Sequence, residues 1–168
     1  MGVTGRDRRA EFVDYAQARR PQLRRMAYAL CGDWHTAEDI VQTALARLYV
    51  AWPRVRRTDA EDAYVRQTIL RATIDESRRP WRRERSGLDG FDQPAEPGVD
   101  PGDRHDLVAA LQQLPEMQRR TVVLRHWLGL SVAETARDLR ISEGTVKSHT
   151  SRALERLHAL MTEEGSHR

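Results

Sequence analysis

Residues 130–160, LSVAETARDLRISEGTVKSHTSRALERLHAL, decide the fold of this chain. Ser131, followed three residues later by Glu134, forms a capping box, which predicts that a helix begins at Val132. After a short turn, Ser142 is the cap residue of a second helix, and Gly144 leaves the backbone at that N-terminus open to a phosphate group. Two helices joined in this way predict a helix-turn-helix, whose second helix enters the DNA major groove, rather than an ordinary helical hairpin.

The apolar period assigns the two faces of these helices. The residues expected to face inward are Val132, Ala136, Leu139, Ile141, Val146, Ala153, Leu154, Leu157, Leu160 and Met161. The residues expected to face outward on the second helix are Thr145, Lys147, Ser148, Ser151, Arg152 and Glu155. This outward face is rich in hydroxyl and basic groups, as a base-reading surface requires.

The net charge of +3 hides a segregated distribution. Residues 1–83 carry a net +6, residues 84–106 a net −5 and residues 107–168 a net +2. Basic ends around an acidic connector predict a polyanionic partner for the two ends.

Several classes of protein are disfavoured. Cys31 is the only cysteine, which fits a reducing compartment, and a metal site with His35 lacks a second pair of ligands. No apolar run reaches the ~20 residues of a membrane span, and no signal-peptide core is present. The six histidines show no catalytic spacing, and no Gly-rich phosphate loop occurs. We therefore expect a soluble cytoplasmic protein that is not an enzyme and uses no cofactor or metal.

The first half of the chain reads as three helices. The first is expected over residues 8–30, with a break or kink near Pro21. The second is expected over residues 36–52, opened by a capping box at Thr36 and stopped by Pro53. A basic loop over residues 53–60 and a third helix over 60–79 complete this lobe.

A cluster of arginines around an aromatic ring ends the first lobe. The segment 78–85, RRPWRRER, combines charges for phosphate contacts with Trp81 for base stacking. Residues 86–104 combine Gly, Pro and Asp, which predicts a flexible acidic linker. Further helices are expected from Leu107 and over residues 116–127. The predicted architecture is all-α, with small helical domains at 1–85 and 105–168 joined by the linker.

The segments AEDIVQTALARLYVAW (37–52), AYVRQTILRATIDESRR (63–79), LQQLPEMQRRTVVLRHWLGLSVAETA (111–136) and ISEGTVKSHTSRALERL (141–157) together resemble one known family. They are similar to the bacterial extracytoplasmic-function (ECF) sigma factors of the sigma-70 family, in the actinobacterial SigE-like branch. The similarity covers about residues 8–160. It implies a dissociable RNA polymerase subunit that directs promoter-specific initiation, with a region 2 domain, a linker and a region 4 helix-turn-helix.

The resemblance also implies partners and site residues. Region 2 of the family docks on the clamp helices of the polymerase β′ subunit, and region 4 lies near the β flap. The residues that match the polymerase-binding face are Glu38, Asp39, Gln42, Thr43 and Arg47. The residues that match the surface for the −10 promoter element are Arg54, Arg56, Arg57, Tyr64, Arg66, Arg71, Arg78, Arg79, Trp81, Arg82 and Arg83. The residues that match the surface for the −35 element are Arg119, Arg120, Ser142, Gly144, Thr145, Lys147, Ser148, Ser151 and Arg152. An anti-sigma factor is a further candidate partner, whereas a membrane or a small-molecule substrate is not expected.

Two positions depart from the family pattern, and one alternative stays open. Arg71 stands where the family usually has Asn, which leaves the base choice at −10 open. Arg140 stands where many members have Gly, and a side chain there makes a left-handed turn harder to adopt. The segment ISEGTVKSH is an equally good match to LuxR-type activators, so a stand-alone DNA-binding activator is the alternative function.

Overall fold

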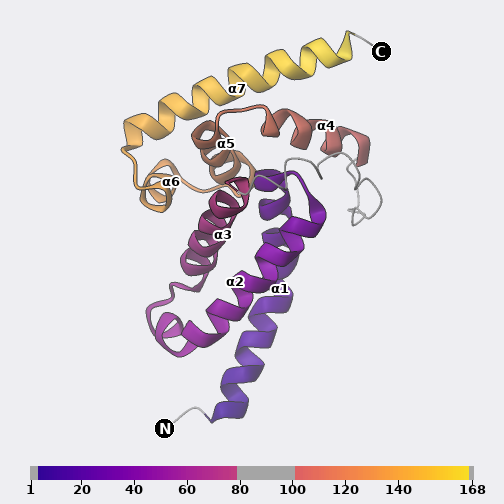
Figure 1. Cartoon of the computed structure of the whole chain (residues 1–168). Coiled ribbons are helices and arrows are strands. Elements are labelled where there is room, and N and C mark those ends of the chain that lie inside the picture. The colour runs from indigo at the N-terminus through magenta and orange to yellow at the C-terminus, as the bar shows by residue number, and fades with distance from the viewer. Residues whose placement is uncertain (1–3, 79–100, 167–168) are drawn as a thin grey trace.

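A computed structural model describes residues 4–78 and 101–166 of the protein (Figure 1). The elements in chain order are α1 (Gly5–Cys31), α2 (Trp34–Val55), the 3-10 turn η1 (Arg56–Thr58), α3 (Glu61–Ser77), α4 (Pro101–Gln112), α5 (Glu116–Val122), the π-helical turn η3 (Val123–Trp127), α6 (Val132–Leu139) and α7 (Glu143–Gly165). Within those two ranges the chain contains no strand, which confirms the predicted all-α class.

The first lobe is a bundle of α1, α2 and α3, which pack against one another in pairs. Its centre is made by side chains such as Met26, Leu48 and Ile69, none of which is accessible to solvent. Burying each of these side chains stabilises the fold by roughly 2 kcal/mol relative to exposure. The apolar period of α2 predicts an inward stripe of Ile40, Val41, Ala44, Leu45, Leu48 and Tyr49. All of these residues are buried except Tyr49, which is 50% exposed, so that part of the prediction is wrong.

An aromatic cluster packs the N-terminal half of α1 against the C-terminal half of α2. Phe12 makes an edge contact with Trp52 at 5.4 Å between ring centroids, and Tyr15 lies 5.2 Å from the same ring. The Tyr15 hydroxyl donates a 2.6 Å hydrogen bond to Asp62 at the start of α3. Burial, followed by this bond to a carboxylate, raises the pKa of Tyr15, so the phenol stays protonated at any physiological pH. These contacts hold the ends of α2 and α3 in register.

The turn between α1 and α2 corrects one detail of the sequence analysis. Gly32 is left-handed, at φ 76°, as expected for a helix C-terminus. The cap of α2 is Asp33, whose carboxylate accepts from the Thr36 amide at 2.9 Å, so the predicted capping box at Thr36 is wrong. Thr36 lies inside the first turn of the helix instead.

Pro21 and Pro53 do not end helices. Pro21 lies inside α1, which is helical on both sides of it, and the predicted break is therefore not observed. Pro53 lies inside α2, which continues to Val55. Most of the predicted loop 53–60 is consequently helical, and only Asp59 and Ala60 separate η1 from α3.

The second lobe contains α4, α5, η3, α6 and α7. Helix α4 begins at Pro101, so the end of the predicted linker 86–104 is helical. The single helix expected over residues 116–127 changes at Val123 from α-helical to π-helical geometry. There the amide of Leu128 donates to the carbonyl of Val123 at 3.0 Å, one residue wider than the α-helical spacing.

The helix-turn-helix forms as predicted. Ser131 and Glu134 close the capping box of α6, with hydrogen bonds of 3.0 Å and 2.7 Å. Ser142 caps α7 by accepting from the Thr145 amide at 3.1 Å. Arg140 adopts the left-handed conformation, at φ 55°, although it has a side chain, so the turn keeps the geometry that Gly usually provides.

Two of the residues predicted to face inward on α7 do not. Val146, Ala153 and Leu157 are buried as expected, but Leu154 and Met161 are each 42% exposed. The buried stripe of α7 is therefore narrower than the apolar sequence pattern, because only the side that faces α4, α5 and α6 is covered.

The two lobes pack against each other over the described residues, with a single hydrophobic cluster that runs through both. Residues Val108 and Leu111 of α4 belong to the same cluster as the core of the first lobe. The side-chain amide of Gln112 donates to the carbonyl of Ala29 at 3.0 Å. In Figure 1, α6 also lies beside α3, far from it in sequence. Contacts of this kind join the two lobes over the described residues.

Candidate nucleic-acid interface

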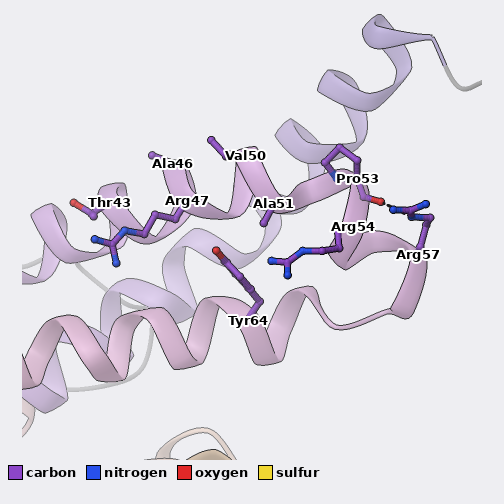
Figure 2. Close-up of a pocket in the computed structure, with 9 residues that line it drawn as sticks. All are labelled: Thr43, Ala46, Arg47, Val50, Ala51, Pro53, Arg54, Arg57 and Tyr64. Atoms are coloured by element: carbon purple, nitrogen blue, oxygen red, sulfur yellow. Dashed lines mark hydrogen bonds between the residues drawn. The ribbon is translucent and has the colours of Figure 1, made fainter.

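An open cleft lies between the C-terminal half of α2 and the start of α3 (Figure 2). It has a volume of about 780 Å³ and continues into a second cleft of about 500 Å³. Arg47, Arg54 and Tyr64 line both of them, and Arg71 lines the second. Figure 2 shows the Tyr64 ring rising from α3 toward the side chains of Arg47 and Arg54 on α2.

Helical spacing brings these side chains together. Arg47 and Arg54 are seven residues apart on α2, and Tyr64 and Arg71 are seven residues apart on α3. Seven residues are close to two helical turns, so each pair lies on one face of its helix. The packing of α2 on α3 then points both faces into the same cleft.

The electrostatics of the cleft favour an anion. Within the part of the chain that the structure describes, Arg47, Arg54 and Arg71 form no ion pair. Among the described residues, no carboxylate lines either cleft. Three arginines with no acidic partner beside an accessible aromatic ring offer charge for phosphates and a flat surface for a base.

Other arginines predicted for the −10 surface are already engaged. Arg56 forms ion pairs with Asp59 at 3.3 Å and Glu61 at 3.1 Å. The Arg57 side chain donates to the Pro53 carbonyl at 3.0 Å and reaches the rim of the cleft.

Neither Arg66 nor Arg78, also predicted for the −10 surface, lines either cleft. Arg66 forms an ion pair of 2.8 Å with Asp138 of the second lobe. Arg78 is exposed just after α3, whereas the predicted residues Arg79, Trp81, Arg82 and Arg83 lie outside the described residues.

The predicted polymerase-binding face divides into three parts. Asp39, Gln42 and Thr43 are exposed on α2 and are available to a partner. Glu38 is half-buried and forms ion pairs with arginines of α1, so it ties α1 to α2. Arg47 points into the cleft with the predicted −10 residues. The seven-residue spacing of Arg47 and Arg54 on one helix was the sequence signal that could have predicted the place of Arg47 in the cleft.

The recognition helix α7 presents a polar face to solvent. Gly144, Lys147, Ser148, Ser151 and Arg152 are exposed, and the buried Val146 and Ala153 anchor the opposite side. The hydroxyls of Ser142 and Thr145 lie 2.8 Å apart at the N-terminus of the helix. The helix dipole adds positive potential at this end, where a phosphate would bind.

Arg119 and Arg120 of α5, also predicted for the −35 surface, are turned inward. Arg120 is only 9% exposed and pairs with Glu116 of the preceding turn. Arg119 donates to the Gln112 side chain at 2.8 Å. Burial lowers the pKa of both guanidinium groups from the ordinary arginine value, although they remain cationic. In this arrangement they support the packing of α5 rather than the exposed surface.

Residues 4–78 and 101–166 lack two further kinds of site. No cluster of three His, Cys, Asp or Glu side chains there could hold a metal ion. None of the helices in those ranges is long and apolar enough to cross a membrane.

Both lobes match known sigma-factor models. The sigma-70 region 2 model matches residues 16–83, and the sigma-70 region 4 model matches residues 104–157. The chain is 38% identical over 153 residues to the RNA polymerase sigma-E factor of Streptomyces coelicolor, covering 88% of this chain and 84% of that protein. It is 30% identical over 140 residues to the ECF RNA polymerase sigma factor SigM of Mycobacterium tuberculosis, covering 83% of this chain and 71% of the relative.

Two solved structures share the fold over about nine-tenths of this chain. The sigma factor RpoE of Bartonella quintana, in complex with the anti-sigma factor NepR, is 25% identical with a TM-score of 0.75, covering 90% of this chain and 97% of that one. CnrH, in complex with the cytosolic domain of CnrY, is 19% identical with a TM-score of 0.69, covering 92% of this chain and 90% of that one. Because both lobes match sigma regions, the alternative of a stand-alone LuxR-type activator finds no support. The chain belongs to the ECF RNA polymerase sigma factors of the sigma-70 family.

Proposed function

We propose that this sigma factor binds core RNA polymerase through α2 and opens its promoters by capturing the unpaired −10 strand in the cleft between α2 and α3. The observation that carries the proposal is the gathering of three unpaired arginines, Arg47, Arg54 and Arg71, around Tyr64. Extruding a base from the duplex costs a few kcal/mol, and stacking on an aromatic ring with phosphate contacts offsets that cost.

The −35 element is read by α7 in this proposal. Lys147, Ser148, Ser151 and Arg152 reach base edges in the major groove, and the capped N-terminus at Ser142 contacts a phosphate. Arg119 and Arg120 serve this surface indirectly, because their bonds fix α5, on which α7 packs. Two weak DNA-binding surfaces on one chain together give specific binding, because once one element is bound the other surface is held at a high effective concentration near its own element.

The exposed part of α2, formed by Asp39, Gln42 and Thr43, is the contact for the β′ clamp helices. This face is continuous with the −10 cleft, because Thr43 lines the cleft as well. Polymerase and the melted strand would therefore share α2, which couples core binding to promoter opening. The protein itself performs no catalytic step in this scheme.

An anti-sigma factor is proposed as a regulatory partner, since a sigma factor of the same fold was solved in complex with the anti-sigma factor NepR. Such a partner would compete for the same exposed surfaces that polymerase uses. The test is co-purification with a tagged chain, followed by loss of core binding when the captured partner is added back.

The experiment that tests the main proposal is transcription from a genomic promoter library with purified core polymerase. Transcripts that appear only when the protein is added, downstream of a shared bipartite motif, are the expected result. The quadruple variant Arg47→Ala, Arg54→Ala, Tyr64→Ala, Arg71→Ala should still bind core polymerase but yield no open complexes on those promoters. Normal promoter opening by that variant would refute the assignment of the cleft.

A further inference from the structure

We propose that Arg71 of α3 makes the smaller cleft, of about 500 Å³, selective for an unpaired guanine base. This inference names the base that the −10 cleft takes, so it rests on the proposed function. Arginine stands here in place of the asparagine that is usual in the family, so a base in this cleft meets a different set of hydrogen-bonding groups.

The arginines of the two clefts differ in how far they extend along the groove. Arg47 and Arg54 line both clefts, as contacts to the continuous phosphate backbone of a bound strand would require. Arg71 lines only the smaller cleft. The Arg71 guanidinium therefore meets the nucleotide held in the smaller cleft rather than the strand as a whole.

The floor of the smaller cleft gives shape but little base selectivity. Val55 and Thr68 are buried, at 5% and 8% exposed, and Ala60 and Ala63 line the same cleft. Small and apolar side chains of this kind can contact the ring of any base. The Tyr64 ring adds a stacking surface, and stacking on an aromatic ring also tolerates every base. Selectivity therefore has to come from polar groups on the walls.

The neutral polar side chains of the smaller cleft already donate hydrogen bonds within the protein. The hydroxyls of Thr58 and Thr68 donate to backbone carbonyls at 3.0 Å and 2.9 Å, and the Gln67 amide donates to another at 2.6 Å. Among the described residues, by contrast, the Arg71 side chain forms no ion pair. Its donors are available to a ligand, so the selected base should present acceptors to them.

A guanidinium group with free donors matches one edge of guanine. Guanine carries two neighbouring acceptors, O6 and N7, which an arginine binds together. Adenine has an amino group beside N7, and thymine has an N–H between its two carbonyl oxygens, so neither base offers such a pair.

Cytosine also carries two neighbouring acceptors, O2 and N3, and is the closest competitor. Length along α3 favours guanine over cytosine. Tyr64 and Arg71 are seven residues apart, which is about 10.5 Å along the helix. A base stacked on Tyr64 and bonded to Arg71 has to span part of that distance, and the two fused rings of a purine span more of it than one pyrimidine ring.

The test is a selection experiment with the complex of full-length protein and core polymerase. The probe is a pool of forked promoter fragments randomised through both elements, with the −10 strand unpaired, and the bound fraction is sequenced. We expect one −10 position to favour guanine over each other base by about fivefold or more. Arg71→Ala should lose this preference at that position alone, and Arg71→Gln should shift it toward adenine.

Arg78→Ala is the matched control, because Arg78 is an exposed arginine just after α3 that lines neither cleft. This variant removes the same charge and should keep the guanine preference. Arg71 is itself exposed, so its variants should keep the wild-type urea midpoint. A cytosine preference at every selective position, or a guanine preference that persists in Arg71→Ala, would overturn the proposal.

A modified base then tests which edge of guanine is bound. In 7-deazaguanine a C–H group replaces N7, while O6 and the Watson–Crick edge are unchanged. Placed at the selected position, it should weaken binding to the wild-type complex by about threefold or more, because one hydrogen bond is lost. The Arg71→Ala complex should bind both bases equally well. Equal binding of both bases by the wild-type complex would show that Arg71 does not contact N7, and the proposed contact would be wrong.

Tyr64→Ala separates failure of this inference from failure of the proposed function. Because stacking tolerates every base, Tyr64→Ala should weaken binding whichever base stands at the selected position. If Tyr64→Ala weakens binding but Arg71→Ala keeps the guanine preference, only the role of Arg71 is refuted. If neither Tyr64→Ala nor an abasic site at that position weakens binding, the strand does not enter the cleft and both proposals fail.

Discussion

The sharpest test of the −10 cleft compares two arginines two residues apart. Arg54 lines both clefts and has no acidic partner among the described residues, whereas Arg56 is held by Asp59 and Glu61. Both belong to the same basic segment, and the sequence assigned both to DNA. The structure predicts that only Arg54 neutralises a phosphate, because the charge of Arg56 is already balanced within the protein.

The magnitude follows from counterion release. For single-stranded DNA, the slope of log K against log salt is about −0.7 for each phosphate neutralised. Arg54→Ala should therefore make the slope less negative by about 0.7. Between 50 and 200 mM salt, this corresponds to roughly 2.5-fold less loss of affinity. Arg56→Ala should leave the slope almost unchanged, although it removes the same formal charge. Removing Arg47, Arg54 and Arg71 together should make the slope less negative by about 2.

The assay is fluorescence anisotropy of the sigma–core complex with a forked promoter fragment whose −10 strand is unpaired, over a series of salt concentrations. Core polymerase is included because, in the proposed function, the sigma–core complex is the species that opens the promoter. Equal slopes for the Arg54 and Arg56 variants would refute the reasoning, because they would show that the internal ion pairs of Arg56 do not decide which arginine meets DNA. A slope for Arg54→Ala equal to wild type would exclude it from the phosphate-binding set.

Three further predictions test other surfaces. Lys147→Ala should cost about 1–3 kcal/mol in binding to the cognate −35 duplex if its exposed ammonium reads a base, and equal losses on scrambled duplexes would mark a phosphate contact instead. Asp39→Arg, on the exposed face of α2, should weaken binding to core polymerase with the urea midpoint unchanged, and normal core affinity would remove this residue from the interface. Glu134 accepts hydrogen bonds from Ser131 that lower its pKa, so its stabilising effect is complete above the ordinary glutamate pKa near 4.5 and is lost as the pH falls through the lower folded value. The stability difference between wild type and Glu134→Gln, from urea unfolding, should accordingly be largest at neutral pH and shrink below about pH 4.5. A stability difference between wild type and Glu134→Gln that grew as the pH fell would contradict the stabilising role of the ionised Glu134 carboxylate.

Local signals in the sequence predicted the helix-turn-helix because its interactions are local. The capping box at Ser131 and the cap at Ser142 join residues three apart, so their geometry follows once the chain is helical. The same reasoning failed at Thr36, where two cap candidates lie three residues apart and Asp33 is the better acceptor. It also failed at Pro53, because proline near a helix end is tolerated when tertiary packing holds the helix.

The sequence by itself determined the all-α class, the helix-turn-helix, the exposed polar face of α7 and the arginine-rich character of the first lobe, since helical period and composition are readable residue by residue. Only the tertiary structure decided which arginines are available. Arg54 and Arg56 look alike in sequence, but one faces an open cleft and the other faces two carboxylates. Arg66 meets Asp138 across the lobes, 72 residues away, and no local pattern encodes that contact. Charge on a chain is fixed by its sequence, whereas the partner of each charge is fixed by which surfaces pack together.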